Sequence, residues 1–165
     1  MNTYTLRPYK DKDCPAVLEI WNEVVEEGGS FPFEETWKEE QLSAMLKDTT
    51  YNCVAVNEKD QVRGFYMLHP NIIGRCSSGA NATYLVHKDC RGEHIGQMLV
   101  LDSIAKARAY GFRYMQFNGV VDSNIHARHL YKRCGFREIG VIPKGFRIKD
   151  GTYQDMHIMY LNLSE

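Results

Sequence analysis

The sequence predicts an α/β (α+β) fold: one domain over residues 1–165 with a mixed, mostly antiparallel sheet of about seven strands and four helices. The length of 165 residues suits a single domain, which should bury roughly 70% of its unfolded surface. Hydrophobic residues at 44% and charged residues at 25% are average for a globular protein and exclude a disordered chain, a collagen or a coiled-coil rod. Segments of helical and strand periodicity follow in the order β-α-α-β-β-β-α-β-α-β-β, without a repeat or a linker.

The first element is a strand, because residues 3–9 alternate between apolar and polar side chains. Asp13 has the character of a helix N-cap, and apolar residues at helical spacing then predict a helix that Gly28-Gly29 ends. The loop Gly-Gly-Ser-Phe-Pro-Phe follows, and a second helix is expected over residues 35–47.

The centre of the chain predicts a hairpin followed by a crossover. Residues 51–56 and 62–68 should pair as antiparallel strands across the polar turn Asn-Glu-Lys-Asp. A strand over residues 81–87 leads into the strongest helical stripe of the chain, which Gly111 ends, and a short buried strand follows over 114–117. Because the connection is long and helical, this strand–helix–strand unit should be a right-handed parallel crossover.

The C-terminal part predicts one helix and two strands. The helix covers residues 124–134 and Gly135 closes it. The strands cover residues 136–142 and 153–163, with a turn around Lys149-Asp150-Gly151 between them. Strands outside the crossover can pair antiparallel, which gives a mixed sheet covered by helices.

Charge and cysteine content limit the classes of function. Twenty Lys and Arg against 21 Asp and Glu leave a net charge of −1, with no basic excess for nucleic acid or acidic membranes. No apolar run approaches the roughly 20 residues that span a bilayer, and the first residues show no secretory signal. The five cysteines suit neither a zinc site nor a disulfide framework. We therefore expect a cytoplasmic protein with reduced thiols, no metal, and neither nucleic acid nor membrane as partner.

The most informative stretch follows the strand that ends near Val86, where Arg91-Gly-Glu-His-Ile-Gly96 opens the long helix. The free N–H groups of a helix's first turn attract anions. Gly92 and Gly96 leave room for a bulky phosphate, and Arg91 adds a positive charge. A glycine-bearing helix start is also common in plain tight turns, so this signal is weak alone.

A second motif lies about 30 residues further on, in the helix from Asn124 to Cys134 that ends in Gly-Phe. Asn124 and Tyr131 are seven residues apart and therefore lie on one helical face. A tyrosine there can donate a proton to a leaving group as a general acid. The alternative is a packing tyrosine whose hydroxyl finds a partner.

Together the two motifs resemble those of the GCN5-related N-acetyltransferase (GNAT) superfamily over nearly the whole chain. Arg-Gly-x-x-Ile-Gly after a strand is similar to the family's pyrophosphate loop, and Asn-x-x-Ala-x-x-Leu-Tyr-x-x-x-Gly-Phe to its second cofactor-binding helix. The resemblance implies acetyl-CoA as cosubstrate and a sheet splayed between strands 4 and 5. It also implies direct attack of an amine on acetyl-CoA in a ternary complex. Dimers are common in the superfamily, which implies a homodimer.

The resemblance assigns roles to individual residues. It implies that Leu85 and Val86 pair with the pantetheine arm and that Tyr131 protonates the departing thiolate. The family usually has glycine at the position of His94. We expect that His94 is simply tolerated there in a helical conformation. The alternatives are that its imidazole crowds a phosphate, or that it points outward and helps to hold one. The implied cofactor contacts are Leu85, Val86, Arg91, Gly92, Glu93, His94, Ile95, Gly96, Gln97, Asn124 and Tyr131.

Three shorter segments, residues 74–84, 116–118 and 140–144, resemble the fungal proline-analogue acetyltransferases, which acetylate azetidine-2-carboxylate. This resemblance implies a small amine acceptor, an amino acid or analogue, with Asn81 and Asn118 in the substrate site. An amide can donate to a carboxylate and also orient an amine. The alternative is that Asn81 caps a loop and Asn118 ends a strand.

The acceptor side has further candidates. Phe31 and Phe33 in the Gly-Gly-Ser-Phe-Pro-Phe loop either line the site of a small acceptor or pack into the core beneath the loop. Tyr84 likewise either faces the substrate cleft or belongs to the core. Candidates for the base that deprotonates the amine are the carboxylates that flank this loop and three histidines, and none of them is singled out: Glu26, Glu27, Glu34, Glu35, His69, His87 and His126. Two other functions remain open: acetylation of a protein N-terminus or lysine, and an acyl-CoA-binding module without turnover.

Overall fold

In the computed structural model, which describes residues 2–164, strands and α-helices follow one another in the predicted order. The strands are β1 (Thr5–Pro8), β2 (Tyr51–Val56), β3 (Val62–Pro70), β4 (Gly79–Val86), β5 (Tyr114–Val121), β6 (Arg137–Arg147) and β7 (Tyr153–Asn162). The α-helices are α1 (Cys14–Glu27), α2 (Glu39–Lys47), α3 (Ile95–Ala109) and α4 (Ile125–Arg133). Within the described residues, no helix is both long and apolar enough to cross a bilayer.

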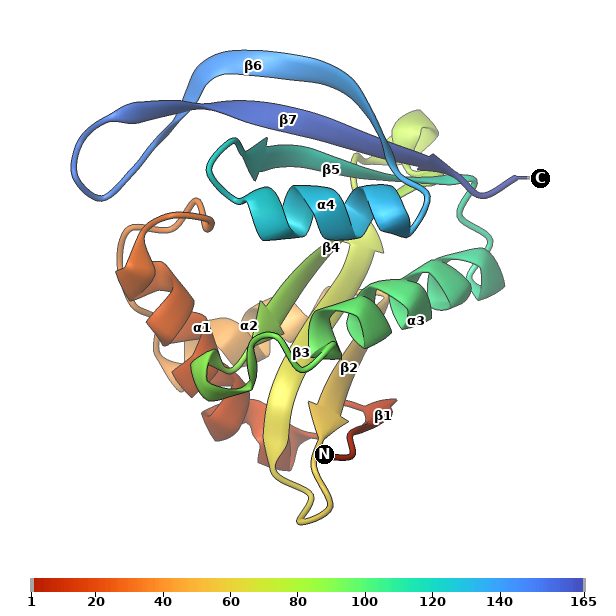
Figure 1. Ribbon diagram of the computed structural model, residues 1–165. Coiled ribbons are helices and arrows are strands. Elements are labelled where there is room, and N and C mark those ends of the chain that lie inside the picture. The colour runs from red at the N-terminus through yellow and green to blue at the C-terminus, as the bar shows by residue number, and fades with distance from the viewer. Residues whose placement is uncertain (1, 165) are drawn as a thin grey trace.

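The strands form one seven-stranded sheet in the order β1-β2-β3-β4-β5-β7-β6 (Figure 1). The predicted β2–β3 hairpin and the predicted parallel crossover from β4 through α3 to β5 are both confirmed. Parallel pairing between β4 and β5 is limited to Gly79 with Tyr114 and Ala80 with Met115. Beyond these two pairs the strands separate, so the sheet is splayed between strands 4 and 5 as expected.

Each face of the sheet has its own hydrophobic core. Helices α1 and α2 pack on one face, against side chains such as Phe65, Met67 and Leu85. Helix α3 packs on the other face with residues of α4, against side chains that include Tyr66 and Met115. Because successive strand residues point to opposite faces, the splay between β4 and β5 connects the two sides of the molecule.

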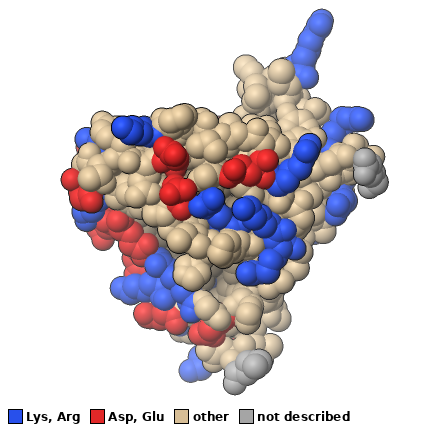
Figure 2. Space-filling view, turned by 45° about the horizontal axis from the view of Figure 1, so that its top comes forward, with Lys and Arg blue, Asp and Glu red and all other residues tan. Residues whose placement is uncertain are grey.

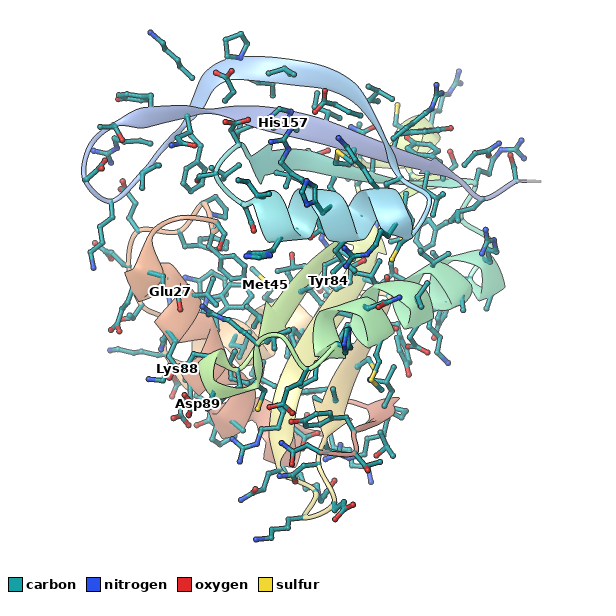
Figure 3. The ribbon with its side chains drawn as sticks, in the orientation of Figure 1. Glu27, Met45, Tyr84, Lys88, Asp89 and His157 are labelled. Atoms are coloured by element: carbon teal, nitrogen blue, oxygen red, sulfur yellow. The ribbon has the colours of Figure 1, made fainter. Side chains whose placement is uncertain are left out.

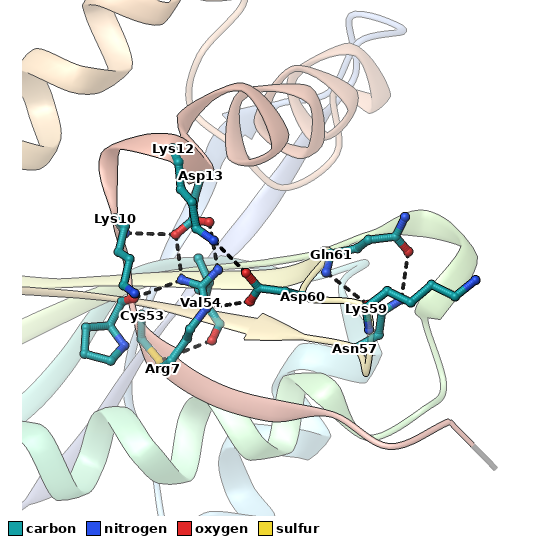
Figure 4. A network of polar contacts seen from close by, with 11 residues as sticks. Arg7, Lys10, Lys12, Asp13, Cys53, Val54, Asn57, Lys59, Asp60 and Gln61 are labelled. Carbon is teal, nitrogen blue, oxygen red and sulfur yellow. Dashed lines mark hydrogen bonds and ion pairs between the residues drawn. The ribbon is translucent and has the colours of Figure 1, made fainter.

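Asp13 is the N-cap residue of α1, as predicted, but its side chain makes no capping hydrogen bond to the helix. Its carboxylate accepts hydrogen bonds from Arg7 at 2.8 and 2.9 Å and from the backbone N–H of Lys10 at 2.8 Å. Arg7 also contacts Asp60 in the β2–β3 turn (Figure 4). A 3-10 turn over Asp11–Asp13 precedes α1, and the Asp13 carboxylate serves this turn and β1 and not the first turn of the helix.

Helix α2 begins at Glu39, four residues after the predicted start at Glu35. The Asn22 side chain on α1 explains the difference. It donates to the carbonyl of Trp37 at 3.0 Å and accepts the N–H of Trp37 at 2.8 Å. Both backbone groups of Trp37 are therefore taken by a tertiary contact, which holds this segment out of the helix.

Helix α3 begins at Ile95, so residues 91–94 form a turn before the helix and not its first residues. Gly92 has a φ of +84° and His94 a φ of +64°. Both values lie in the left-handed region, which a right-handed helix does not use. The expectation that His94 stands in a helical conformation is wrong: it is the left-handed N-cap of α3.

Candidate active site

A cavity of about 570 Å³ occupies the splay between β4 and β5. It brings together seven of the predicted site residues, which come from the loop after α1, from β4, from β5 and from α4. They are Phe31, Phe33, Asn81, Tyr84, Asn118, Asn124 and Tyr131. Met45 and Tyr84, labelled in Figure 3, reach the same cavity from α2 and β4.

The cavity has two ends, because its strand residues alternate between the faces of the sheet. Tyr84 and Phe117 belong to the core under α3 and α4, where Tyr131 also packs. Met67, Phe31 and Phe33 belong to the core under α1 and α2. A molecule that passes through the splay would therefore have one end beside α4 and the other beside the loop after α1.

The turn before α3 offers a group of free backbone donors. Helical bonding starts with the Met98 N–H, which donates to the carbonyl of His94 at 3.2 Å. The N–H groups of Gly92, His94, Ile95, Gly96 and Gln97 donate to no described residue. Alternation of left- and right-handed residues turns such donors toward one point, and the dipole of the 15-residue α3 lies behind them. This geometry suits an anion such as a phosphate.

The charged side chains of this turn are already paired. Arg91 donates to Glu27 on α1 at 2.7 Å; Figure 3 shows Glu27 near Lys88 and Asp89 of the neighbouring turn. Glu93 accepts from Tyr4 at 2.6 Å, and this hydrogen bond lowers the pKa of Glu93. The Ile95 side chain is 1% exposed, so only its backbone can reach a ligand.

Leu85 and Val86 differ in which way their backbones face. The Gly79 carbonyl accepts from Asn71 and the His87 N–H donates to Arg63, so the odd-numbered backbone groups of β4 point toward β3. Strand alternation directs those of Ala82, Tyr84 and Val86 into the splay. The predicted pairing of Leu85 with an extended ligand does not fit, because its backbone faces β3 and its side chain is buried under α1.

Tyr131 has the features of a proton donor. Its ring packs on Phe117 with centroids 4.5 Å apart, and its hydroxyl hydrogen-bonds to no described residue. Burial raises the pKa of Tyr131 above its usual value of 10.0, so the phenol keeps its proton at neutral pH. Tyr84, by contrast, has its hydroxyl 2.7 Å from the Ser103 Oγ.

Helix α4 is held in place at its start. The Asn124 side chain accepts the Ala127 N–H at 3.4 Å as N-cap while it lines the cavity. His157 on β7, labelled in Figure 3, contacts Asp122 just before the helix at 2.7 Å. Arg128 on α4 contacts the same Asp122 at 3.2 Å. These contacts fix the element that carries Tyr131.

Helix α4 also contributes positive charge. It carries Arg128, Lys132 and Arg133 and no acidic residue. Figure 2 shows a contiguous group of Lys and Arg side chains on one face, beside separate groups of Asp and Glu. The net charge of −1 therefore conceals local patches, and a basic helix beside the cavity favours an anionic ligand.

Asn81 and Asn118 are connected through a residue that the sequence did not single out. The Oδ1 of Asn71 accepts from the Nδ2 of Asn81 at 3.1 Å and from the Nδ2 of Asn118 at 2.7 Å. Asn71 lies in the loop after β3, ten residues from Asn81 and 47 from Asn118. No periodicity or spacing could have linked them.

Phe31 and Phe33 satisfy both predicted alternatives, since they line the cavity and also pack on the core. Their ring centroids lie 4.9 and 5.5 Å from that of Trp21, which is fully buried. The end of the β6–β7 hairpin covers this loop. There Arg147 pairs with Glu34, and the Lys149 N–H donates to the Gly28 carbonyl at 3.2 Å.

Other lining residues were missed by the sequence reasoning. Several of them are large and apolar, among them Met45, Met67, Phe146 and Met156. Only the fold shows that they face the cavity, because an apolar residue in a helix or strand usually indicates core. His69, one of the histidines that the sequence left open as a base, also lines the cavity, and its Nδ1 lies 2.9 Å from the carbonyl of Pro70.

Away from this cavity, Glu19, Glu23 and His87 hold possible metal-ligating atoms within 4.8 Å of one another. Lys88 pairs with Glu23 at 3.2 Å and supplies a counter-charge to the carboxylates. Nothing else in the cluster indicates an ion, and the absence of a metal stays a prediction. All five cysteines are free thiols.

Comparison with known proteins gives consistent results. A family model described as "Acetyltransferase (GNAT) family" matches residues 15–136. The N-acetyltransferase aca1 of Schizosaccharomyces pombe is 31% identical over 105 residues, which are 63% of this chain. The matched region spans 50% of that relative, so the chain covers about half of its length.

Solved structures share the fold over almost the entire chain. A GCN5-related N-acetyltransferase from Kribbella flavida is 31% identical, with a TM-score of 0.91 and coverage of 97% of this chain and 98% of that one. A phosphinothricin acetyltransferase from Sinorhizobium meliloti, in complex with acetyl-CoA, is 23% identical with a TM-score of 0.92. It covers 99% of this chain and 90% of its own. The second likeness is one of fold alone.

Proposed function

The chain belongs to the acetyltransferase (GNAT) family, and from that premise we propose that it is an acetyl-CoA-dependent N-acetyltransferase. Its acceptor is the amine of a small molecule, an amino acid or analogue, which attacks directly in a ternary complex. One observation carries the proposal: Tyr131, Asn81 and Asn118 line one cavity in the splay between β4 and β5. Acetyl-CoA supplies the acetyl group as an activated thioester.

The residues around the splay suit this cosubstrate. The free N–H groups of Gly92 and of residues 94–97 would hold the diphosphate, as helix N-termini hold anions. The Val86 and Tyr84 backbones face the splay and would pair with the pantetheine arm. An N–H on that edge can also stabilise negative charge on a carbonyl oxygen as it develops. Arg91 would reach a phosphate by exchanging its Glu27 partner.

Tyr131 would act as the general acid. Burial raises the pKa of Tyr131 above 10.0, so the phenol is protonated before the reaction. As the attacking amine forms the new C–N bond and the C–S bond breaks, the phenol would give its proton to the departing sulfur and regain one from the proton that the amine loses. Asn124 would contact the cosubstrate from the N-terminus of the same helix. The amine must be neutral to attack, and we assign no base for its deprotonation.

The acceptor end favours a small molecule that carries a carboxylate. Asn81 and Asn118 can each donate an N–H to such a group. The end of the β6–β7 hairpin contacts the loop with Phe31 and Phe33, through Arg147 with Glu34 and through Lys149 with Gly28, and a peptide acceptor would have to pass beside these contacts. We therefore place the acceptor among amino acids or analogues, and azetidine-2-carboxylate is the first compound to test.

Acetylation of a protein N-terminus or lysine, and cofactor binding without turnover, are the competing functions. A screen of small amino acids and short peptides, with release of free CoA as readout, separates all three. We expect turnover with small amino acids or analogues. Turnover with peptides alone would contradict the acceptor class, and tight acetyl-CoA binding without turnover on any amine would contradict the enzyme itself.

We further propose a single catalytic domain over residues 1–165, a homodimer and a cytoplasmic location. The location rests on five free thiols, which suit a reducing compartment. The homodimer is proposed because dimers are common in the superfamily, and light scattering would measure the mass of the particle in solution. We also propose that no metal takes part, which dialysis against a chelator before the assay would test.

A further inference from the structure

The amides at the acceptor end form a network whose orientation can be worked out from one backbone group. The Ala82 N–H donates to the Oδ1 of Asn81 at 2.8 Å. A backbone N–H can only donate, so the Asn81 atom beside it must be the oxygen. The other atom of that amide is therefore Nδ2, which faces Asn71 at 3.1 Å.

The same logic continues through Asn71. Because a donor faces it, the Asn71 atom in this contact must be its oxygen, Oδ1. Asn118 approaches that same oxygen at 2.7 Å and must therefore present its Nδ2. The Oδ1 of Asn118 then faces Gln116, whose Nε2 donates to it at 3.1 Å. All four amides have one consistent orientation, and a single N–H at the open edge of β4 fixes it.

The consequence is a site that offers donors. The amide oxygens of Asn71, Asn81 and Asn118 are all occupied by hydrogen bonds within the network. Asn81 and Asn118 each use one Nδ2 hydrogen to reach Asn71 and keep the second for a ligand. Without Asn71 the Ala82 N–H would still orient the Asn81 amide, but its Nδ2 would lose its partner. Asn118 would lose the contact that sets its orientation, because Gln116 is itself an amide that can turn with it; an Asn118 amide turned by 180° would present its oxygen to the ligand.

We propose that Asn71 is a positioning residue: by accepting from both Asn81 and Asn118, it directs their remaining N–H groups toward an acceptor's carboxylate. This inference rests on the proposed function, since it concerns the acceptor of that same site. It assigns Asn71 no contact with acetyl-CoA and no part in proton transfer. Its effect lies in the preference for a carboxylate over an uncharged group of the same shape.

The test compares azetidine-2-carboxylate with azetidine-2-carboxamide, as the ratio of the two kcat/KM values. Asn71→Asp keeps the shape and the oxygen acceptors but adds a negative charge, and we expect it to lower the ratio about tenfold or more by repelling the carboxylate. Asn71→Leu removes the shared acceptor, which frees Asn118 to turn and leaves the Asn81 Nδ2 without its partner, and we expect a fall of about 2- to 10-fold. Ser77→Ala, an exposed change in the same loop, is the matched control and should keep the wild-type ratio.

The outcomes separate the inference from the function on which it rests. A wild-type enzyme without preference for the carboxylate would overturn the proposed acceptor class. A wild-type preference that survives in both Asn71 variants would overturn the role of Asn71 alone. An equal loss on both acceptors, with a lower melting temperature and weaker acetyl-CoA binding, would show that Asn71 only holds its loop. If Asn71→Leu does not fold, the near-isosteric Asn71→Asp decides.

Discussion

Replacing Tyr131 with Phe removes a single hydroxyl from the cavity wall and keeps the ring that packs on Phe117. That hydroxyl bonds to no described residue, so its loss should change the free energy of unfolding by no more than about 0.5 kcal/mol. As a general acid, however, it should contribute a factor on the order of 10²–10⁴ in rate. Tenfold in rate corresponds to about 1.4 kcal/mol, so the barrier should rise by about 3–5 kcal/mol.

Tyr84→Phe is the matched comparison, because it removes the same atom from the same cavity. The Tyr84 hydroxyl lies 2.7 Å from the Oγ of Ser103, which is fully buried. Its loss should cost about 0.5–1.5 kcal/mol of stability. Since this hydroxyl is engaged by α3, we expect the rate to fall by less than about tenfold, far below the loss from an acid.

The assay measures CoA release under saturating acetyl-CoA, with cofactor affinity by calorimetry and stability by urea unfolding. We expect Tyr131→Phe to lose turnover while its acetyl-CoA affinity and stability stay near wild type. We expect Tyr84→Phe to lose stability instead. If Tyr131→Phe turns over an accepted amine at the wild-type rate, Tyr131 is not the acid.

Three other predictions concern stability. At the left-handed His94, glycine should be more stable than alanine by about 1 kcal/mol, and equal urea midpoints for the two variants would contradict the strain argument. Burial and a hydrogen bond to Asp102 raise the pKa of Tyr66 above 10.0, so the free energy of unfolding should fall as pH rises past about 10; a flat profile in alkaline urea titrations would contradict this. Arg7→Met leaves Asp13, 4% exposed, without its charged partner and should cost about 3–5 kcal/mol at pH 7. Burial raises the pKa of Asp13, but the hydrogen bonds from Arg7 outweigh burial and lower it. In the variant Asp13 loses this stabilisation and takes up a proton as the pH falls past the ordinary pKa of 3.8, so the cost of the substitution should become smaller at low pH. An equal cost at pH 7 and pH 3.5 would refute the pairing.

The sequence predicted the order of the elements and the parallel crossover because both depend on periodicity and connection length. The same signals placed Asn124 and Tyr131 on one helix, and the structure brings them to the cavity with Asn81 and Asn118. Asn81 and Asn118 were predicted only from the resemblance to the proline-analogue acetyltransferases. Nothing in the local sequence distinguishes an asparagine that lines a cavity from one in a turn.

What escaped prediction depends on tertiary contacts. The start of α2 moved because Asn22 holds both backbone groups of Trp37. The backbone of Leu85 faces β3 because of the register between β3 and β4. A sequence does not predict strand register to within one residue. His94 adopts a left-handed conformation that its residue type disfavours, and Asn71 joins residues that are distant in the chain.

A crystal structure of this chain with bound acetyl-CoA tests the central claim most directly. We expect the diphosphate to accept hydrogen bonds from backbone N–H groups of residues 92–97. The thioester sulfur should then lie within about 3.5 Å of the Tyr131 hydroxyl, beside Asn81 and Asn118. A cofactor bound elsewhere, or one whose thioester lies outside the splay between β4 and β5, would contradict the account.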